Sequence, residues 1–246
     1  EVGHPPGNPV FQLIARFFTM FTGPDKAAVM VNSMSALCSA LTIFFLYLTI
    51  VFLVKRVVAP KRGGEGGTEE YSPGQAIAIY GSGAVGALAY CFSDTFWFSA
   101  VEGEVYAMSS LFTAMVVWAM TKWYEETDRR YANRWIVLIS FLMGLSIGVH
   151  LLNLLAIPML VYMYYFKMRE DKPYSFWEYV KILAVSVVIL AFILFFMVPY
   201  IPKIAAYFDL FFVNTLGLPY NTGAAFFIVA LLTACFWGLF KTLKTE

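Results

Sequence analysis

Long apolar runs separated by short polar segments fill most of this sequence. A helix needs about 20 predominantly apolar residues to cross a bilayer, because it rises about 1.5 Å per residue through a hydrocarbon layer of about 30 Å. The runs that reach or approach this length are residues 27–54, 75–98, 103–121, 135–166, 178–199 and 224–240. The pattern therefore predicts an all-α, polytopic transmembrane helical bundle.

The stretch 135–166 is long enough for one span or two, and the placement of positive charge decides between them. If it divides at His150 into short spans 135–149 and 151–166, the chain crosses the membrane seven times. The segments that then share one side are 55–74, 122–134, 167–177 and the C-terminal end. Of the 17 Lys and Arg residues, all but three then lie on that side, the exceptions being Arg16, Lys26 and Lys203. Treated as one span, the stretch weakens this asymmetry, so the positive-inside rule favours seven spans with a cytoplasmic C-terminus.

The first 26 residues form the first outer loop in this topology, and residues 27–246 form the transmembrane domain. Residues 9–22 are helical in pattern but too short to span, and Gln12 and Arg16 make one side polar. We expect a helix that lies in the membrane interface. The chain opens on Glu1 without a Met or a signal peptide, so we expect it to be an internal piece of a longer protein.

Composition narrows the function further. The chain is 60% apolar and 13% charged, and its net charge of +1 gives no reason to expect a nucleic-acid partner. Each of the three cysteines stands alone in an apolar run, which fits neither a disulfide framework nor a zinc site. No spacing of acidic residues supports another metal, so we predict neither a metal nor a certain cofactor.

One familiar motif carries no chemistry here. Gly81-Ser-Gly-Ala-Val-Gly86 matches the dinucleotide fingerprint, but that motif works only between a strand and a helix. Inside an apolar span, small residues instead let another helix approach closely. Gly144 and Gly148 receive the same interpretation.

Polar side chains collect on the side opposite the basic loops. His4-Pro-Pro-Gly7 is a rigid element, since two prolines favour an extended path while Gly7 lets the chain turn. It can hold an imidazole above the membrane, where histidine donates a proton or binds a phosphate. Asn8 follows on the same loop. The alternative is a loop that only leads into the interfacial helix.

Two carboxylates stand at the start of the span 103–121. Ser99-Ala-Val-Glu102 has the pattern of a capping box, which would give Glu102 a structural task. Glu104 has no such explanation, and a carboxylate at the edge of a span is costly unless it is hydrated or paired. We therefore regard Glu104 as a functional candidate, with Tyr106 as a nearby hydrogen-bond donor. A solvated helix start is the alternative.

His150 and Asn153 lie three positions apart and share a helix face. They stand between two apolar segments, where a polar pair is costly unless it faces a cavity or a partner helix. The pair therefore indicates either a binding site or a hydrogen bond that joins two helices.

Four segments of the chain resemble a known family. They are Glu1-Val-Gly-His-Pro-Pro-Gly-Asn-Pro9, Asn32-Ser-Met-Ser-Ala-Leu37, Phe96-Trp-Phe-Ser-Ala-Val-Glu-Gly-Glu-Val-Tyr-Ala-Met108 and Gly144-Leu-Ser-Ile-Gly-Val-His-Leu-Leu-Asn153. In this order they resemble bacterial, Bacteroidetes-type protein O-mannosyltransferase-like membrane proteins of the GT-C glycosyltransferase superfamily. The block 96–108 is the most specific of the four.

The resemblance implies an inverting transferase in the bacterial inner membrane. Such enzymes move a sugar, mannose by analogy, from a polyprenyl-phosphate carrier to a protein Ser or Thr on the outer face. By that pattern Glu104, His4 and Glu102 would act in catalysis, and His150, Asn153, Tyr106 and Asn8 would bind substrate. The family also has an Asp and Glu pair about ten residues before the His-Pro-Pro-Gly element. This chain begins too late to contain that pair, so we expect the catalytic base upstream and the fragment to be inactive alone.

Two other functions remain open at this point. A transporter for a small solute would line a path across the bilayer with polar residues, but the spans hold few polar residues in their cytoplasmic halves. A non-catalytic membrane subunit would use its helices to bind partners.

Overall fold

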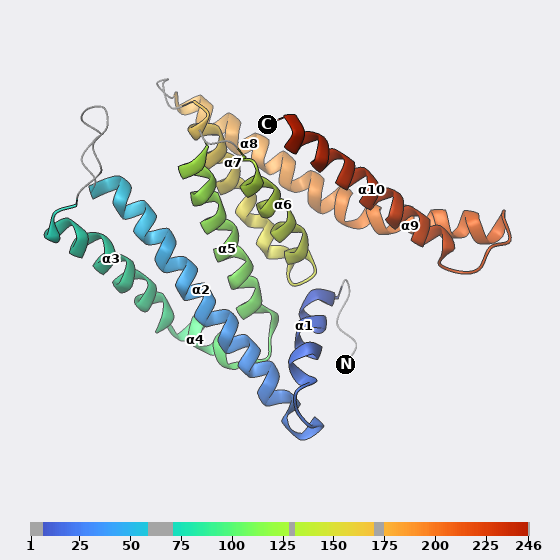
Figure 1. Cartoon of the computed structure of the whole chain (residues 1–246), viewed down its shortest axis with the longest axis horizontal. Helices are drawn as coiled ribbons and strands as arrows, with labels where there is room; N and C mark the ends of the chain where they lie inside the picture. Colours follow the sequence, from blue (N-terminus) through green and yellow to red (C-terminus); the bar gives the residue numbers. More distant parts are fainter. Residues whose placement is uncertain (1–6, 59–70, 128–130, 170–174, 246) are drawn as a thin grey trace. The chain divides into compact units, whose positions relative to one another are not determined.

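The computed structural model describes residues 7–58, 71–127, 131–169 and 175–245, and every regular element in these ranges is helical (Figure 1). The all-α prediction is confirmed. The chain divides into two compact units. Unit 1 comprises Glu1–Thr127 with Ala132–Ala156, and unit 2 comprises Asp128–Tyr131 with Ile157–Glu246.

Unit 1 contains most of the helices. They are α1 (Pro9–Thr19), the 3-10 turn η1 (Pro24–Lys26), α2 (Ala27–Val58), α3 (Pro73–Cys91), α4 (Asp94–Val101), α5 (Val105–Glu126), α6 (Arg134–Ile147) and the 3-10 helix η2 (Leu151–Ala156). The described part of unit 2 is also helical. Its elements are α7 (Ile157–Lys167), α8 (Phe176–Phe192), the π-helical turn η3 (Ile193–Met197), α9 (Val198–Asn214) and α10 (Thr222–Thr245).

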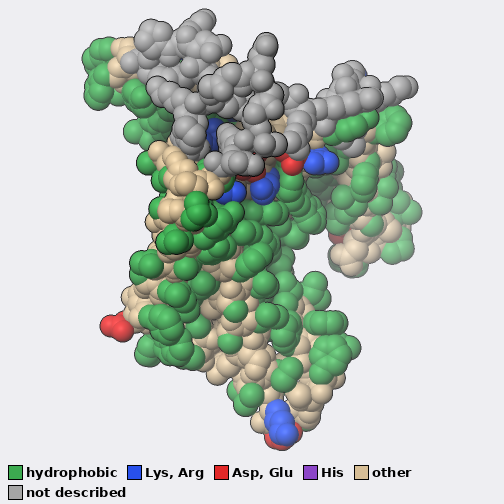
Figure 2. All heavy atoms as spheres, turned by 60° about the vertical axis from the view of Figure 1, so that its left-hand side comes forward, with side chains coloured by type: hydrophobic (Ala, Val, Ile, Leu, Met, Phe, Trp, Pro, Cys, Tyr) green, Lys and Arg blue, Asp and Glu red, His purple; other side chains and the backbone are tan. Residues whose placement is uncertain are grey.

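Three helices of the described chain are long and apolar enough to cross a membrane: Pro24–Val58, Phe176–Asn214 and Thr222–Thr242. A fourth span results if the bent pair α3 and α4 counts as one. Hydrophobic side chains also cover most of the surface visible in Figure 2. These features support a helical membrane protein. Seven spans would also require α5, α6 and the η2–α7 segment to cross, and this count stays a prediction.

The predicted span 75–98 is bent in the structure, because the chain turns by 67° between α3 and α4. Phe92 leaves the helical conformation, with φ −95° and ψ 10°. The hydroxyl of Ser93 donates to the carbonyl of Tyr90 at 2.8 Å, and α4 starts at the next residue. The Ser93 hydroxyl thus supplies a hydrogen-bond donor to a carbonyl in the last turn of α3. Carbonyls at a helix end lack a partner within the helix, and inside an apolar run water does not replace it.

The helix that contains the predicted span 178–199 is longer than that span, because it continues through Pro202 to Asn214. A proline lacks the N–H that would bond the preceding turn and its ring collides with the carbonyl there. The π-helical turn η3 comes just before Pro199 and Pro202 and takes up this mismatch without ending the helix. The resulting 39-residue helix is about 58 Å long, roughly twice the hydrocarbon thickness.

Glycines of α3 let it pack closely on α2. A Cβ at Gly83 would lie 2.7 Å from Val51 Cγ2, and a Cβ at Gly86 would lie 2.8 Å from Ile50 Cδ1. The close-packing interpretation of this glycine-rich segment is confirmed at these two positions. Gly81 and Gly144 have open space where a Cβ would be, so the same interpretation is wrong for them.

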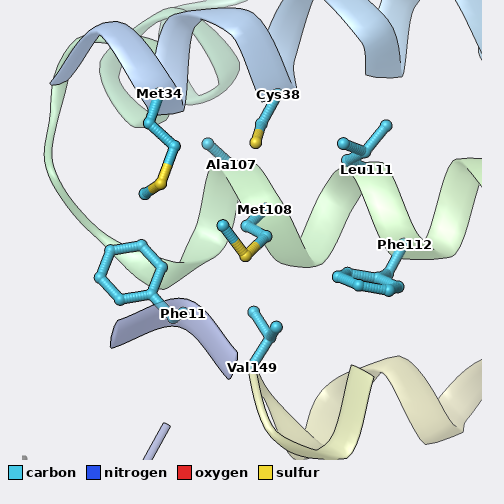
Figure 3. Packing of buried hydrophobic residues seen from close by; sticks show 8 residues of the cluster. All are labelled: Phe11, Met34, Cys38, Ala107, Met108, Leu111, Phe112 and Val149. Carbon is cyan, nitrogen blue, oxygen red and sulfur yellow. The ribbon is translucent and has the colours of Figure 1, made fainter. Parts of the chain in front are cut away.

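The core of unit 1 joins segments that are far apart in the sequence. Its buried members come from α1, α2, α5 and the turn after α6, and they are Phe11, Met34, Cys38, Ala107, Met108, Leu111, Phe112 and Val149 (Figure 3). Helix α1 is therefore anchored on the bundle through Phe11. Its exposed apolar residues, Leu13, Phe17 and Met20, remain uncovered in the described chain.

Candidate functional site

The first turn of α1 rests on the turn that follows α6. The backbone N–H of Val10 donates to the carbonyl of Gly148 at 2.9 Å. A Cβ at Gly148 would lie 2.5 Å from Val10 Cγ2, so only a glycine permits this approach without a shift of Val10. Val10, which follows the His-Pro-Pro-Gly element, is therefore held against Gly148, two positions before His150 in the sequence.

His150 lies against Tyr106 of α5, with 5.6 Å between the ring centroids and an angle of 46° between the planes. The Nδ1 atom of His150 accepts a hydrogen bond from the backbone N–H of Leu152 at 3.2 Å. In neutral histidine, a ring nitrogen that accepts leaves the hydrogen on the other nitrogen. His150 thus keeps Nε2–H as a donor. The Tyr106 side chain is exposed, so its hydroxyl is available beside this donor.

Asn153 is buried and joins η2 to α5. Its Oδ1 accepts hydrogen bonds from Ser109 Oγ at 2.6 Å and from Thr113 Oγ1 at 2.9 Å. Its Nδ2 is buried and has no hydrogen-bond partner among the described residues. Asn153 therefore forms the hydrogen bond between helices that was one of the two interpretations of the His150–Asn153 pair. A direct role in substrate binding stays a prediction.

The turn between α4 and α5 carries both candidate carboxylates. Glu104 is exposed at the N-cap position of α5, and its side chain makes no capping bond. Glu102 is half-buried at the C-cap position of α4. The predicted Ser99–Glu102 capping box is wrong, because Ser99 lies inside α4 and its hydroxyl donates to Thr95 O at 3.1 Å. Glu102 is therefore free of the structural task that the sequence pattern suggested.

Gly103, between the two carboxylates, lies on α2. A Cβ there would lie 3.0 Å from Val31 Cγ1 and 3.1 Å from Asn32 Oδ1. The turn can lie this close to α2 because its middle residue has no side chain. This contact sets the position of the turn that carries Glu102 and Glu104.

The remaining predicted site residues lie at the start of α1. Asn8 is half-buried, and its Oδ1 accepts a hydrogen bond from Gln12 Nε2 at 3.0 Å, within the same helical turn. Its side chain is thus engaged locally. His4 lies outside the described residues. Among the residues that the structure describes, no group of three or more His, Cys, Asp or Glu side chains could hold a metal ion.

Several residues of this region were not singled out from the sequence. Ser109 and Thr113 bond Asn153, and Val10 bonds Gly148. Tyr106, Ser109 and Thr113 are spaced i, i+3 and i+7, which places them on one helix face. This polar stripe within a predicted span was the available signal. No comparable signal marked Val10, whose contact depends on its backbone N–H.

All four segments that carry the family resemblance contribute to this region. Residues 1–9 lead directly into Val10 and Phe11, and residues 32–37 supply Met34 to the core. Residues 96–108 supply Met108, and residues 144–153 supply Val149 (Figure 3). The same two segments also supply Tyr106 and His150, whose rings are in contact. Segments separated by many tens of residues thus meet at one end of unit 1.

Comparison with known proteins identifies a related family. The family model for the protein O-mannosyl-transferase TMEM260 N-terminal domain matches residues 1–173. The protein O-mannosyl-transferase tmem260 of Dictyostelium discoideum is 23% identical over 183 residues, which cover 69% of this chain and 19% of that protein. The chain therefore spans about a fifth of the length of this relative. No solved structure matches the chain significantly.

Proposed function

The chain belongs to the family of the protein O-mannosyl-transferase TMEM260 N-terminal domain, and from this premise we propose that it forms part of a membrane glycosyltransferase. The proposed reaction moves mannose from a polyprenyl-phosphate donor to a Ser or Thr hydroxyl of a protein. The proposed architecture is GT-C-like with seven spans.

The proposed topology places the reaction on the face opposite the Lys- and Arg-rich loops. Residues 1–26 then lie outside with α1 in the interface, and the C-terminal end lies in the cytoplasm. In a bacterium this is the periplasmic face of the inner membrane. The spans would be those of the three long helices, the bent α3–α4 pair, α5, α6 and the η2–α7 segment.

One observation carries the proposal. Residues of three of the four family segments pack into a single cluster with Phe11 of α1, and this cluster brings the start of α1, the start of α5 and the turn after α6 together. We call this meeting point of α1, α5 and the turn after α6 the junction. It gathers polar side chains, which are costly to place in a lipid-embedded protein. A site that handles a charged lipid phosphate and a protein hydroxyl needs such groups at the edge of the membrane.

The chemistry of transfer is a single displacement with inversion. The acceptor oxygen attacks the anomeric carbon, the bond from that carbon to the donor phosphate oxygen breaks, and polyprenyl phosphate departs with the electron pair. The proton of the acceptor hydroxyl passes to a carboxylate that acts as general base. Donors directed at the departing phosphate stabilise the charge that develops there.

The residues of this chain fit these tasks as follows. Nε2–H of His150 and the hydroxyl of Tyr106 donate to the phosphate, and His4 adds a second imidazole from the loop that leads into α1. Glu104, exposed and without a capping bond, lines the acceptor side of the pocket without being the general base itself, and Glu102 lies beside it. Asn153 holds η2 on α5 and so keeps His150 in place. Asn8 shapes the first turn of α1 through Gln12.

The proposal is tested by sugar transfer with the complete protein that contains this chain. The assay uses mannose on a polyprenyl phosphate and a Ser/Thr-containing acceptor peptide. We expect His150→Ala and Glu104→Gln each to lower kcat/KM by about 100-fold or more, the usual contribution of a positioned catalytic group. Glu125→Gln is the control for the lost charge, since Glu125 lies at the other end of α5 in an exposed pair with Lys122.

The outcomes separate the alternatives. Wild-type activity in both His150→Ala and Glu104→Gln would remove this junction from the reaction. Absence of transfer in the complete wild-type protein, together with substrate-dependent solute flux in vesicles, would favour a transporter. Absence of both, with retained partner binding, would favour a non-catalytic subunit.

A further inference from the structure

A groove of unit 2 lies between α7 and α8 and has a volume of about 460 Å³. This volume falls within the range of about 300–1,000 Å³ that small-molecule sites occupy. All of its lining residues belong to unit 2, so it is separate from the junction described above. The groove is thus a second site to be explained.

Along both helices, the lining of the groove changes from charged residues at one end to valines at the other. From α7 and its C-terminal end come Val161, Tyr165 and Arg169, spaced four residues apart. From α8 come Glu178, Lys181 and Val185. Residues four apart lie above one another on a helix face. Because Arg169 after α7 bonds Glu178 in the first turn of α8, both helices present charged residues at the same end of the groove and valines at the other.

Arg169 is fixed at the charged end. Its Nη1 donates to Tyr165 Oη and to Glu178 Oε1, the latter at 2.8 Å. The bond with Tyr165 is the largest influence that raises the pKa of Arg169, so the guanidinium stays cationic. The second oxygen of Glu178 accepts the backbone N–H of Ser175 at 3.2 Å. Glu178 therefore orients Arg169 and caps α8.

Lys181 supplies the other positive charge. It is exposed, lines the groove, and forms no ion pair with a described residue. With Arg169 and Lys181 positive and Glu178 negative, the charged end of the groove carries a net charge of +1. A single phosphodiester anion matches this charge.

The depth of the groove suits a lipid. Phe176, Trp177 and Tyr179 are exposed at the start of α8, and exposed aromatic residues of this kind mark the boundary between lipid headgroups and hydrocarbon. Lys181 lies within about a turn and a half of them, and Val185 lies one turn deeper. The charged end therefore lies at the level of the headgroups, and the valine end lies at the level of the acyl chains.

We propose that this groove binds one anionic glycerophospholipid, with its phosphodiester on Lys181 and Arg169 and the first part of an acyl chain along Val161 and Val185. Basic pockets between membrane helices bind anionic headgroups in this way. The apolar wall distinguishes a lipid from free phosphate, which has no chain to fill it. The inference stands independently of the proposed transferase activity.

The test is lipid binding by native mass spectrometry on the complete protein in detergent, with phosphatidylglycerol and phosphatidylcholine as probes. We expect a several-fold preference for phosphatidylglycerol. Lys181→Gln should weaken phosphatidylglycerol binding about fivefold, the size of one basic residue's contribution near an anionic surface. Lys181→Arg should retain binding. Val185→Trp should weaken binding without any change of charge, because the larger side chain fills the apolar end.

Lys203→Gln is the control, since it removes the same charge from α9 of unit 2 outside the groove, where Lys203 lies over Tyr200. Equal losses in Lys203→Gln and Lys181→Gln would show diffuse charge attraction and overturn the proposal. Equal binding of the two phospholipids would overturn it as well. Displacement of phosphatidylglycerol by excess inorganic phosphate, with no effect of Val185→Trp, would identify a free-phosphate site. Tighter binding of polyprenyl phosphate that is lost in Lys181→Gln would assign the groove to the carrier lipid instead.

Discussion

The ring of Tyr106 lies 5.6 Å from the imidazole of His150, centroid to centroid, although 43 positions separate them in the chain. Aromatic rings at such a distance attract each other in tilted arrangements. The contact therefore orients the imidazole, while the backbone N–H of Leu152 holds its Nδ1. Together these contacts fix the orientation of the imidazole and leave its Nε2 out of both.

The two functions of Tyr106, a ring that supports His150 and a hydroxyl that donates, can be separated by substitution. We expect Tyr106→Phe to lower kcat/KM for transfer about tenfold, because it loses one hydrogen bond to a charged group. Tyr106→Ala should approach the loss of His150→Ala, because the imidazole then lacks its support. Tyr220→Phe, at an exposed tyrosine of unit 2, is the control. Equal activity in Tyr106→Phe, Tyr106→Ala and the wild type would show that the ring contact does not serve the reaction.

The approach of α1 to the turn after α6 depends on Gly148. We expect Gly148→Ala to destabilise unit 1 by about 1–3 kcal/mol, since the new methyl group would overlap Val10 Cγ2. The measurement is the free energy of unfolding in detergent, with sugar transfer recorded in parallel. Gly144→Ala provides the control, because open space surrounds that position on the same helix.

A second substitution tests the same contact from the other side. Val10→Ala removes the overlapping methyl groups, so Val10→Ala combined with Gly148→Ala should recover part of the lost stability. Two strictly additive losses would mean that Val10 and Gly148 do not touch in the folded protein.

The bond between Asn153 and Ser109 should appear as coupling in a double-mutant cycle. We compare Asn153→Ala, Ser109→Ala and the pair, with the free energy of unfolding as the measurement. Hydrogen bonds between membrane helices couple by about 0.6 kcal/mol on average and by about 1.7 kcal/mol at most. We expect a value in this range. A coupling of zero would contradict the 2.6 Å hydrogen bond between Ser109 Oγ and Asn153 Oδ1.

The turn between α9 and α10 should not tolerate a side chain at Gly223. A Cβ there would overlap the backbone carbonyl of Phe208, and backbone cannot move aside as a side chain can. Asp209 Oδ1 also accepts the backbone N–H of Gly223 at 3.1 Å, which caps α10. We expect Gly223→Ala to cost about 3 kcal/mol of unfolding free energy.

Gly238 in α10 is the internal comparison for this substitution. It has open space at the Cβ position, so Gly238→Ala should be neutral or stabilise the helix by up to about 1 kcal/mol. Thermal unfolding in detergent measures both variants. Similar melting temperatures for the two would mean that α9 and α10 do not form this tight turn.

Hydropathy along the chain was sufficient to predict an all-helical protein and the approximate location of its helices. An apolar run commits the backbone to helix in lipid, because no other open structure satisfies its N–H and C=O groups. The same pattern could not predict the bend at Phe92 and Ser93 or the continuation through Pro199 and Pro202. Both depend on local hydrogen bonding and on a π-helical turn, which hydropathy does not record.

For the candidate site, the sequence alone identified which scarce polar residues to consider, including Glu104, Tyr106, His150 and Asn153. Only the tertiary structure decided what each of them touches. In the fold, Asn153 is buried against Ser109 and Tyr106 lies beside His150. Glu102 stands at the C-terminal end of α4 and not in a capping box, and Val10 bonds Gly148. The reason is physical: the cost of a polar side chain in an apolar run can be read residue by residue, whereas its partner is chosen by helices that pack together across long separations in the chain.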